Sequence, residues 1–406
     1  MSVEIRPATD AEMDDFRQVA TNALMVAPGL YPPEAIQAIR PDMTLCAFEE
    51  GRVATSYATW PLKIRFNGGA LPVAGITFVG TRPTSRRKGY LRQIVSKHVE
   101  LLHEKGGPSV AVLYASQASI YQRYGYGIVS THHRYTVAPR DLVFAQPMGD
   151  DLAPGRLREL ADDETDLLKT LYRDFVESRT GYLHRGDATW KAGVLWQRSP
   201  NEQPYKVVYE ENGQPLGYVI YSLKGEKRPH GEPWQKIEIA DLVWLTPQAY
   251  RALWRHFSGA GLVFEIRWPC VPQDDPLPHL LLEPRRLNMR ASDGLLARVV
   301  DLPGAMQQRR YDESGQLTFE VIDALCPWNA GRWQLETADD RVSVAPTSRT
   351  PELVISIDTL AMLLFGQISP SEAIRMGRAV APEGCDLAKW DRIMCTRHKA
   401  FCPDFF

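Results

Sequence analysis

The apolar residues in the first part of the chain follow strand spacing and helix spacing in turn. Two apolar segments, residues 45–48 and 53–59, flank a polar turn at residues 49–52 and predict a β-hairpin. Residues 75–80 are apolar and β-prone, and beyond a polar stretch the apolar residues recur at helical spacing. The residues at this spacing are Leu91, Ile94, Val95, Val99 and Leu102. The pattern predicts a strand, a turn and an amphipathic helix in succession.

Polar capping residues mark two further helices. Thr9 and Glu12 have the spacing of a capping box and precede an apolar helix face. Residues 110–114 are apolar and predict another strand. Ser116 then has the character of an N-cap, so we expect it to begin a short helix that carries Tyr121.

A second region repeats this order of elements. Two apolar segments flank a turn at residues 210–213, and the apolar residues 237–245 lead into a helix pattern at 247–257. The turn and the helix start lie 161 and 164 residues after their counterparts. We therefore expect residues 135–290 to form a second domain of the same architecture. Residues 248–251 contain no glycine and little positive charge, so we expect this copy to bind no cofactor.

The last part of the chain predicts a small α+β domain. Residues 295–301 have the pattern of a strand, and residues 333–335 and 342–344 that of a hairpin. The segment Ser369-Pro370-Ser371-Glu372 begins a helix, with a cap, a proline in the first turn and a glutamate three residues after the cap. The predicted domains are residues 1–134, 135–290 and 291–406, which agrees with roughly 150 residues per domain in a chain of 406.

The overall composition excludes several classes of protein. The 47 basic and 49 acidic residues give a net charge of −2, which is too little positive charge for a protein that grips nucleic acid through its phosphates. No apolar stretch approaches the ~20 residues of a membrane-spanning helix, and the N-terminus lacks the layout of a signal peptide. We therefore expect a cytoplasmic protein that binds no nucleic acid and has no membrane span.

The six cysteines are scattered and form no C-x-x-C pair, which is typical of a reduced compartment. The sharpest metal hypothesis is Cys395, His398 and Cys402, but no fourth ligand follows at a recognised zinc spacing. We expect no metal site.

Positive charge gathers in one region. No acidic residue occurs between Glu50 and Glu100, whereas nine basic ones do: Arg52, Lys63, Arg65, Arg82, Arg86, Arg87, Lys88, Arg92 and Lys97. A solvated basic face is one interpretation. The predicted helix, however, begins inside this region, directly after Gly89. A helix N-terminus that is edged with basic side chains and preceded by a glycine suits a pyrophosphate, so we favour an anion site.

The turn Arg86-Arg87-Lys88-Gly89-Tyr90-Leu91 resembles the (Arg/Gln)-x-x-Gly-x-(Gly/Ala) acetyl-CoA loop of the GNAT acetyltransferases, although Leu91 departs from the small residue at the last position. Over its whole length the chain resembles the Eis-type (enhanced intracellular survival) N-acetyltransferases. The markers are Pro83-Thr84-x-Arg86-Arg87-x-Gly89-x-Leu91-Arg92, Ile120-Tyr121-x-Arg123-Tyr124-Gly125-Tyr126-Gly127, Cys326-Pro327-Trp328-Asn329-x-Gly331-Arg332-Trp333 and Cys402-Pro403-Asp404-Phe405-Phe406. The resemblance implies an α+β / mixed α/β fold: tandem GNAT folds, the second degenerate, and a sterol-carrier-protein-like domain.

The resemblance also implies the chemistry, which is transfer of an acetyl group from acetyl-CoA to a primary amine. In that family a tyrosine after the central strand is the acid, which carries the role to Tyr121, and the α-carboxylate of the last residue is the base, which carries that role to Phe406. From the residues alone, Tyr121 could equally be a buried aromatic residue like Tyr124 and Tyr126, and Phe406 could simply fill an apolar groove.

The cofactor residues implied by the resemblance fall into three groups. The backbone of Phe78, Val79 and Thr81 is expected to pair with the pantetheine arm as an added strand would. Ser116 and Gln117 are expected to line the pocket. The pyrophosphate is assigned to a run of seven residues: Arg86, Arg87, Lys88, Gly89, Tyr90, Leu91 and Arg92.

The acceptor implied by the resemblance is a polycationic small molecule such as an aminoglycoside, held in a pocket with acidic walls. The candidates for those walls are Asp14, Asp15, Glu34, Asp42 and Asp404. A protein lysine or another specific amine stays open as the acceptor, as does a lipid- or acyl-CoA-binding protein without transferase activity. A homo-oligomer, a hexamer in most of the family, is carried over from the resemblance alone.

Overall fold

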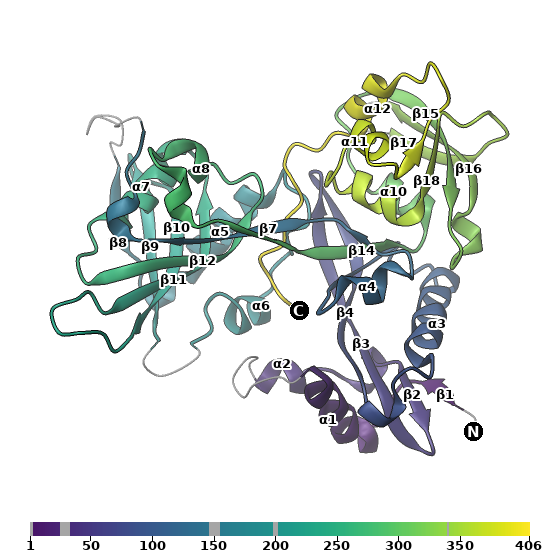
Figure 1. Ribbon diagram of the computed structural model, residues 1–406, viewed down its shortest axis with the longest axis horizontal. Coiled ribbons are helices and arrows are strands. Elements are labelled where there is room, and N and C mark those ends of the chain that lie inside the picture. The colour runs from purple at the N-terminus through teal and green to yellow at the C-terminus, as the bar shows by residue number, and fades with distance from the viewer. Residues whose placement is uncertain (1–2, 25–32, 146–154, 198–201, 339–340) are drawn as a thin grey trace. The chain divides into compact units, whose positions relative to one another are not determined.

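The structure is a computed structural model that describes residues 3–24, 33–145, 155–197, 202–338 and 341–406 (Figure 1). Two compact units divide the chain. The first comprises Met1–Ser130, Thr180–His184 and Asp293–Phe406, and the second comprises Thr131–Arg179 and Arg185–Ser292. No helix among these described residues is long and apolar enough to cross a membrane.

The first unit begins with a seven-stranded sheet in the order β1-β2-β3-β4-β5-β14-β6. Its strands are β1 (Glu4–Arg6), β2 (Cys46–Glu49), β3 (Arg52–Phe66), β4 (Gly69–Thr81), β5 (Val110–Tyr114), β6 (Gly127–Ile128) and β14 (Leu295–Val299). The accompanying helices are α1 (Met13–Leu24), α2 (Pro33–Gln37), α3 (Tyr90–Glu104) and α4 (Ala118–Gln122). The predicted hairpin at residues 45–59 and the strand, turn and helix at 75–102 are confirmed.

The strand predicted at residues 295–301 does not lie in the third sheet. It is β14, which pairs antiparallel with β5 on one side and with β6 on the other (Figure 1). All five of its residues are buried, as expected for a central strand that is covered on both faces. Because its partners lie more than 150 residues earlier in the chain, local sequence pattern could not assign it to this sheet.

The second unit holds a seven-stranded sheet in the order β13-β7-β12-β11-β10-β9-β8. Its strands are β7 (Thr131–Val137), β8 (Arg156–Glu159), β9 (Pro204–Glu211), β10 (Gln214–Gly225), β11 (Gln235–Trp244), β12 (Val263–Pro272) and β13 (Arg290–Asp293). Its helices are α5 (Thr165–Val176), α6 (Asp187–Ala192), α7 (Pro247–Ser258) and α8 (Leu277–Leu280). The predicted second hairpin and the helix after it are confirmed as β9, β10 and α7.

The third sheet completes the first unit and has the order β17-β16-β15-β18-β19. Its elements are α9 (Leu302–Gln307), β15 (Gly315–Ile322), β16 (Gly331–Ala338), β17 (Arg341–Pro346), β18 (Leu353–Ser356), α10 (Ile357–Leu364), α11 (Pro370–Arg375), β19 (Ala379–Val380) and α12 (Leu387–Met394). Ser369 caps α11 and forms the predicted capping box with Glu372. One apolar core joins this sheet to the first, where Phe66 packs 4.9 Å from Phe365 between ring centroids.

The motif at residues 326–333 binds the third sheet to β14. The Arg298 guanidinium on β14 is fully buried and donates at 2.7 Å to both oxygens of Asp323. Asn329 accepts a hydrogen bond from the backbone of Leu302 and donates to the carbonyls of Val299 and Val300. The motif that supports the family resemblance therefore has a structural role, since it fixes one sheet against the other.

Candidate active site

A gap between two parallel strands forms the centre of the candidate site. β4 pairs with β5 only from Val73 to Ile76, although β4 continues to Thr81. Opposite that continuation the register with β3 shifts, since Ser56 pairs with Gly80 and Ala58 with Thr77. A bulge of this kind bends its strand, so β4 ceases to follow β5 beyond Ile76.

Phe78 and Val79 lie in this bulge, and Phe78 has a φ of 49°. A positive φ is uncommon for a residue other than glycine and marks a backbone that its surroundings hold in place. The two residues and Thr81 thus form the part of β4 that does not pair with β5. This segment offers backbone edges to a ligand that enters between the strands.

The turn after β4 leads into α3, and Gly89 is its N-cap. Gly89 has a φ of 81° and Arg87 one of 63°. A Cβ at position 89 would meet no atom within 4 Å, so glycine is required there for its backbone conformation and not for space. The first N–H groups of this 15-residue helix point along its axis toward the turn, as an anion site needs.

Two of the basic side chains near this turn already have acidic partners. Arg82 pairs with Asp15, and Lys88 pairs with Glu49, which also accepts a hydrogen bond from Ser85 at 2.8 Å. The bonds from Lys88 and Ser85 lower the pKa of Glu49 to about 2, so this carboxylate stays charged. The acid-free stretch of sequence is therefore not acid-free in space.

Three arginines at the turn remain available for a ligand. Arg86, Arg87 and Arg92 are exposed, and none of them forms an ion pair with any residue that the structure describes. Of the predicted pyrophosphate ligands, these three side chains and the helix N-terminus after Gly89 are the free ones, whereas the Lys88 side chain is held by Glu49.

The short helix after β5 brings Tyr121 into the same unit. Gln117 is its N-cap and makes no side-chain capping bond, so the predicted cap at Ser116 is wrong. Capping preference favours serine, but here the backbone turns one residue later. Both Ser116 and Gln117 are exposed between β5 and α4, where a ligand could reach them.

Tyr121 differs from its two neighbouring tyrosines in exposure. It is 8% exposed and packs edge to face on Tyr126, with 5.8 Å between ring centroids. Tyr126 is fully buried, and Tyr124 is half-buried. Burial raises the pKa of Tyr121, so its hydroxyl keeps a proton at neutral pH and can donate it.

A buried polar chain beneath this tyrosine was missed by the sequence analysis. The Tyr57 hydroxyl lies 2.9 Å from His98 Nδ1, and Thr59 Oγ1 lies 3.3 Å from His98 Nε2. Burial lowers the pKa of His98 to about 4, so the imidazole is neutral. The signal was present, because His98 lies four residues after Ile94 on the apolar face of α3.

The end of the chain lies against the first sheet at the point where β4 and β5 stop pairing. A Cβ on Gly75 would lie 3.2 Å from Phe406 Cε2. The Tyr114 ring packs 4.5 Å from Phe405 and 5.7 Å from Phe406 between centroids, and its hydroxyl donates to the Cys402 carbonyl at 2.5 Å. Phe406 and the two strands of the gap thus meet, although they come from opposite ends of the sequence.

The acidic residues considered for a substrate pocket are mostly engaged elsewhere. Asp15 pairs with Arg82, Asp14 with Arg17 at 2.9 Å, and Asp42 with Arg40 at 3.0 Å. The remaining two differ, since Asp404 is 7% exposed near the chain end and Glu34 is exposed on α2. Asp404 is thus the candidate whose position is linked to Phe406.

The second unit has the same parallel strand pair but a different helix start. β11 pairs parallel with β12, and its register with β10 shifts between Ile220 and Tyr221, as in the first sheet. Thr246 caps α7 with its own side chain, accepting from the Ala249 N–H at 3.2 Å, and Pro247 follows. This helix N-terminus is therefore closed by its own residues, in contrast to the one after Gly89.

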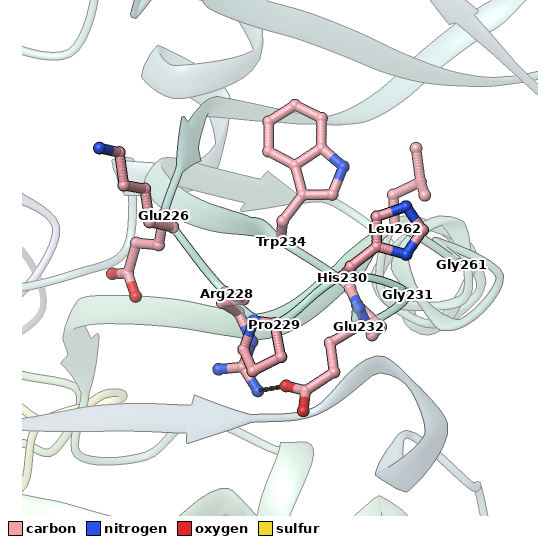
Figure 2. Close-up of a pocket in the computed structure, with 11 residues that line it drawn as sticks. Glu226, Arg228, Pro229, His230, Gly231, Glu232, Trp234, Gly261 and Leu262 are labelled. Atoms are coloured by element: carbon pink, nitrogen blue, oxygen red, sulfur yellow. Dashed lines mark hydrogen bonds and ion pairs between the residues drawn. The ribbon is translucent and has the colours of Figure 1, made fainter.

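Figure 2 shows a pocket of about 510 Å³ in this second unit, and it is separate from the candidate site. It lies in the loop between β10 and β11, and Arg228 pairs with Glu232 at 2.7 Å along its wall. The lining residues are 226–234, 261 and 262, and they include none of the predicted site residues.

Comparison with known proteins agrees with this architecture. The acetyltransferase (GNAT) domain matches residues 4–129 and, as a second model, residues 181–299, and a sterol carrier protein domain matches residues 302–403. A solved structure, Eis1 from Mycobacterium abscessus, is 26% identical with a TM-score of 0.83 and covers 99% of this chain and 100% of its own.

Two relatives establish the family. An uncharacterised N-acetyltransferase of Streptomyces avermitilis is 32% identical over 74% of this chain and 74% of its own length. The N-acetyltransferase Eis of Mycobacterium tuberculosis is 30% identical over 73% of this chain and 71% of its own length. With two GNAT domains, a sterol-carrier-protein domain and these relatives, the chain belongs to the Eis-like family of GNAT N-acetyltransferases and is an acyltransferase.

Proposed function

We propose that this protein transfers the acetyl group of acetyl-CoA to a primary amine of a polycationic small molecule of the aminoglycoside type. The observation that supports the proposal most is the contact of Phe406 with Gly75, at the point where β4 and β5 stop pairing. A base at the chain end would there meet a thioester that lies along the unpaired part of β4.

The donor would lie along the first sheet. The unpaired backbone of Phe78, Val79 and Thr81 would pair with the amides of the pantetheine arm. Arg86, Arg87 and Arg92, together with the helix N-terminus after Gly89, would hold the pyrophosphate. Ser116 and Gln117 would border the arm from the other strand.

The reaction needs a base and an acid. An alkyl amine with a pKa near ~10 is mostly protonated at neutral pH, so a proton must leave before the nitrogen attacks the carbonyl carbon. We assign this proton to the carboxylate of Phe406. A C–N bond then forms and the C–S bond breaks, and Tyr121 gives its proton to the departing thiolate, so that CoA leaves as the free thiol.

Release of free CoA thiol tests the proposal. The protein is mixed with acetyl-CoA and with each of a panel of polyamines and aminoglycosides, and the thiol is measured. We expect release only with an amine present, and we expect Tyr121→Phe to lower turnover about a hundredfold. The matched control is Tyr124→Phe, which should keep turnover within about twofold. Binding of acetyl-CoA without thiol release from any amine would instead indicate an acyl-CoA-binding protein.

We also propose a cytoplasmic homo-hexamer, carried over from the family. Sedimentation of the purified chain measures this directly. A monomer at micromolar concentration would contradict it, without bearing on the chemistry.

A further inference from the structure

Asn67 is a turn residue with unusual surroundings. It and Gly68 form the two-residue loop between β3 and β4, and both have a positive φ, as the hairpin turns that favour Asn-Gly require. Such turns are normally solvated. Asn67, however, is only 1% exposed, which implies that its side chain serves more than the turn.

Three different segments of the first unit meet at Asn67. Its backbone N–H donates to Thr180 Oγ1 at 2.9 Å, and its side-chain Nδ2 donates to the Arg310 carbonyl at 2.8 Å. Its Oδ1 accepts the backbone N–H of Arg397 at 3.2 Å. The side chain therefore uses its acceptor and its donor on two chain segments that lie more than 240 residues away in sequence.

Arg397 lies near the start of the terminal segment, which we define as residues 397–406. All of these residues are described, and none lies in a helix or strand, so side contacts alone can hold the segment in place. Thr180, the partner of the Asn67 N–H, also accepts the backbone N–H of Phe401 at 3.0 Å. Asn67 is thus linked to the terminal segment twice, directly at Arg397 and through Thr180 at Phe401.

Asn67 cannot act on the cofactor or on the acetyl group by contact. It lies eight residues before Gly75, which at ~3.3 Å per residue is roughly 26 Å along β4. Phe78 is farther still along the same strand. Any influence of Asn67 on turnover must therefore pass through the segments that it holds.

We propose that Asn67 is a positioning residue for the chain end: it ties the terminal segment to the β3–β4 hairpin, and so keeps Phe406 against Gly75. The inference rests on the proposed catalytic role of Phe406, but the anchoring itself is measurable without any activity. Asn67→Gly keeps the positive φ of the turn and removes both side-chain hydrogen bonds. The matched control is Asn212→Gly, because Asn212 and Gly213 form the same two-residue loop between β9 and β10, where Asn212 is exposed.

The experiment uses the full chain ending at Phe406 and carboxypeptidase A, which removes C-terminal aromatic residues. Intact mass measures the loss of Phe406 over time. When opening is fast relative to cleavage, release follows the population of the undocked segment. We expect Asn67→Gly to release Phe406 about tenfold faster than the unchanged protein, with kcat lowered severalfold and the KM for acetyl-CoA within twofold. Asn212→Gly should match the unchanged protein in all three.

Equal release from the two glycine variants would overturn the proposal. Should Asn67→Gly fail to fold, Asn67→Asp replaces it, since the aspartate keeps an acceptor for Arg397 and loses the donor to Arg310. We expect its release rate to lie above that of the unchanged protein, and an unchanged rate would overturn the proposal in the same way. If Phe406 is removed from the unchanged protein and turnover persists, the catalytic role of Phe406 fails, while the release rates still decide whether Asn67 anchors the segment.

Discussion

Two glycines of the first sheet have nearly the same backbone conformation but different surroundings. Gly51 has a φ of 77° in the β2–β3 turn, and Gly89 has a φ of 81° at the start of α3. Neither would bring a Cβ within 4 Å of another atom. The two positions therefore carry the same conformational demand, and only Gly89 adjoins the proposed pyrophosphate site.

This pair yields a prediction for the donor site. Gly51→Ala and Gly89→Ala should each lower the free energy of unfolding by about 1 kcal/mol, because alanine disfavours this conformation. Only Gly89→Ala should raise the KM for acetyl-CoA, by roughly three- to tenfold, since the helix N-terminus would shift. Steady-state kinetics and urea unfolding of both variants measure the two effects. An equal KM in the two variants would show that the pyrophosphate binds elsewhere.

His98 gives a prediction about pH. Its pKa is about 4 in the folded protein and near 6.5 ordinarily, so the unfolded chain takes up a proton first as the pH falls. The stability that depends on the neutral imidazole is complete above pH 6.5 and is lost as the pH falls from 6.5 toward 4. Between pH 7.5 and pH 5 the loss is on the order of 2 kcal/mol.

Urea unfolding at those two pH values, for the unchanged protein and for His98→Gln, measures this loss. The advantage of the unchanged protein over His98→Gln should shrink by that amount at pH 5. The exposed His230 provides the control, and His230→Gln should show no such change. A constant difference between the unchanged protein and His98→Gln would contradict the neutral buried histidine.

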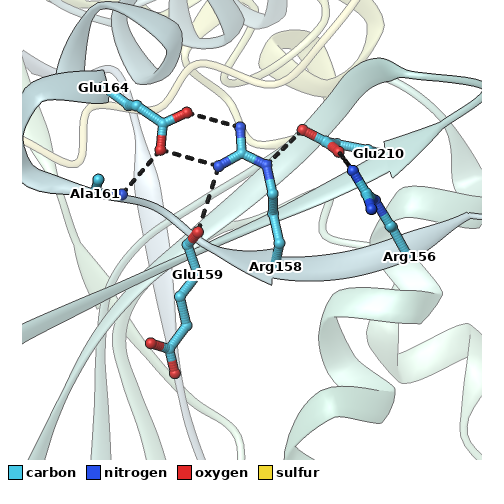
Figure 3. A network of polar contacts seen from close by, with 6 residues as sticks. All are labelled: Arg156, Arg158, Glu159, Ala161, Glu164 and Glu210. Atoms are coloured by element: carbon cyan, nitrogen blue, oxygen red, sulfur yellow. Dashed lines mark hydrogen bonds and ion pairs between the residues drawn. The ribbon is translucent and has the colours of Figure 1, made fainter.

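At the scale of elements, two ion-pair networks contrast in burial. Arg298 and Asp323 have side-chain exposures of 0% and 1%, and they join β14 to the loop after β15. Figure 3 shows the other network, in which Arg158 on β8 bonds with Glu164 and with Glu210 on β9. Its side chains are partly exposed, so water screens the pairs.

Removing one partner should therefore cost different amounts in the two networks. Asp323→Ala leaves the Arg298 charge buried and unpaired, and we expect a loss of about 3–5 kcal/mol from the first unit. Glu164→Ala should cost the second unit about 0–1 kcal/mol. Hydrogen exchange of the amides of β14 and β10 reports each unit separately. Similar losses in the two units would contradict the distinction by burial.

Sequence pattern was sufficient where an element is determined by its own residues. The strand, turn and helix at residues 75–102 follow from local spacing, and Gly89 has the backbone conformation that a helix start after a turn needs. Pattern failed where distant segments decide. β14 joins a sheet whose other strands end by Ile128, and Asp15 and Glu49 neutralise Arg82 and Lys88 across 67 and 39 residues of sequence.

The roles of Tyr121 and Phe406 could not come from pattern either. Three tyrosines lie within residues 121–126, and only burial and packing distinguish them. The position of Phe406 depends on contacts with Gly75 and Tyr114, which no periodicity encodes. The family resemblance supplied both roles, and the geometry makes them chemically reasonable.

At the scale of the whole molecule, the chain returns to its first sheet twice. β14 inserts between β5 and β6, and the terminal segment ends beside β4 and β5. The sterol-carrier-protein domain is thereby fixed to the GNAT domain that it follows by more than 150 residues. We infer that its role in catalysis is to deliver the end of the chain.

The most direct test of this role is to extend the chain past Phe406 by a few glycine and serine residues. Turnover and the Kd for acetyl-CoA are then measured separately on the same protein. If the carboxylate of Phe406 is the base, turnover should fall at least a hundredfold while the Kd stays within about twofold. Turnover equal to that of the unextended chain would contradict the role of the chain end in the reaction.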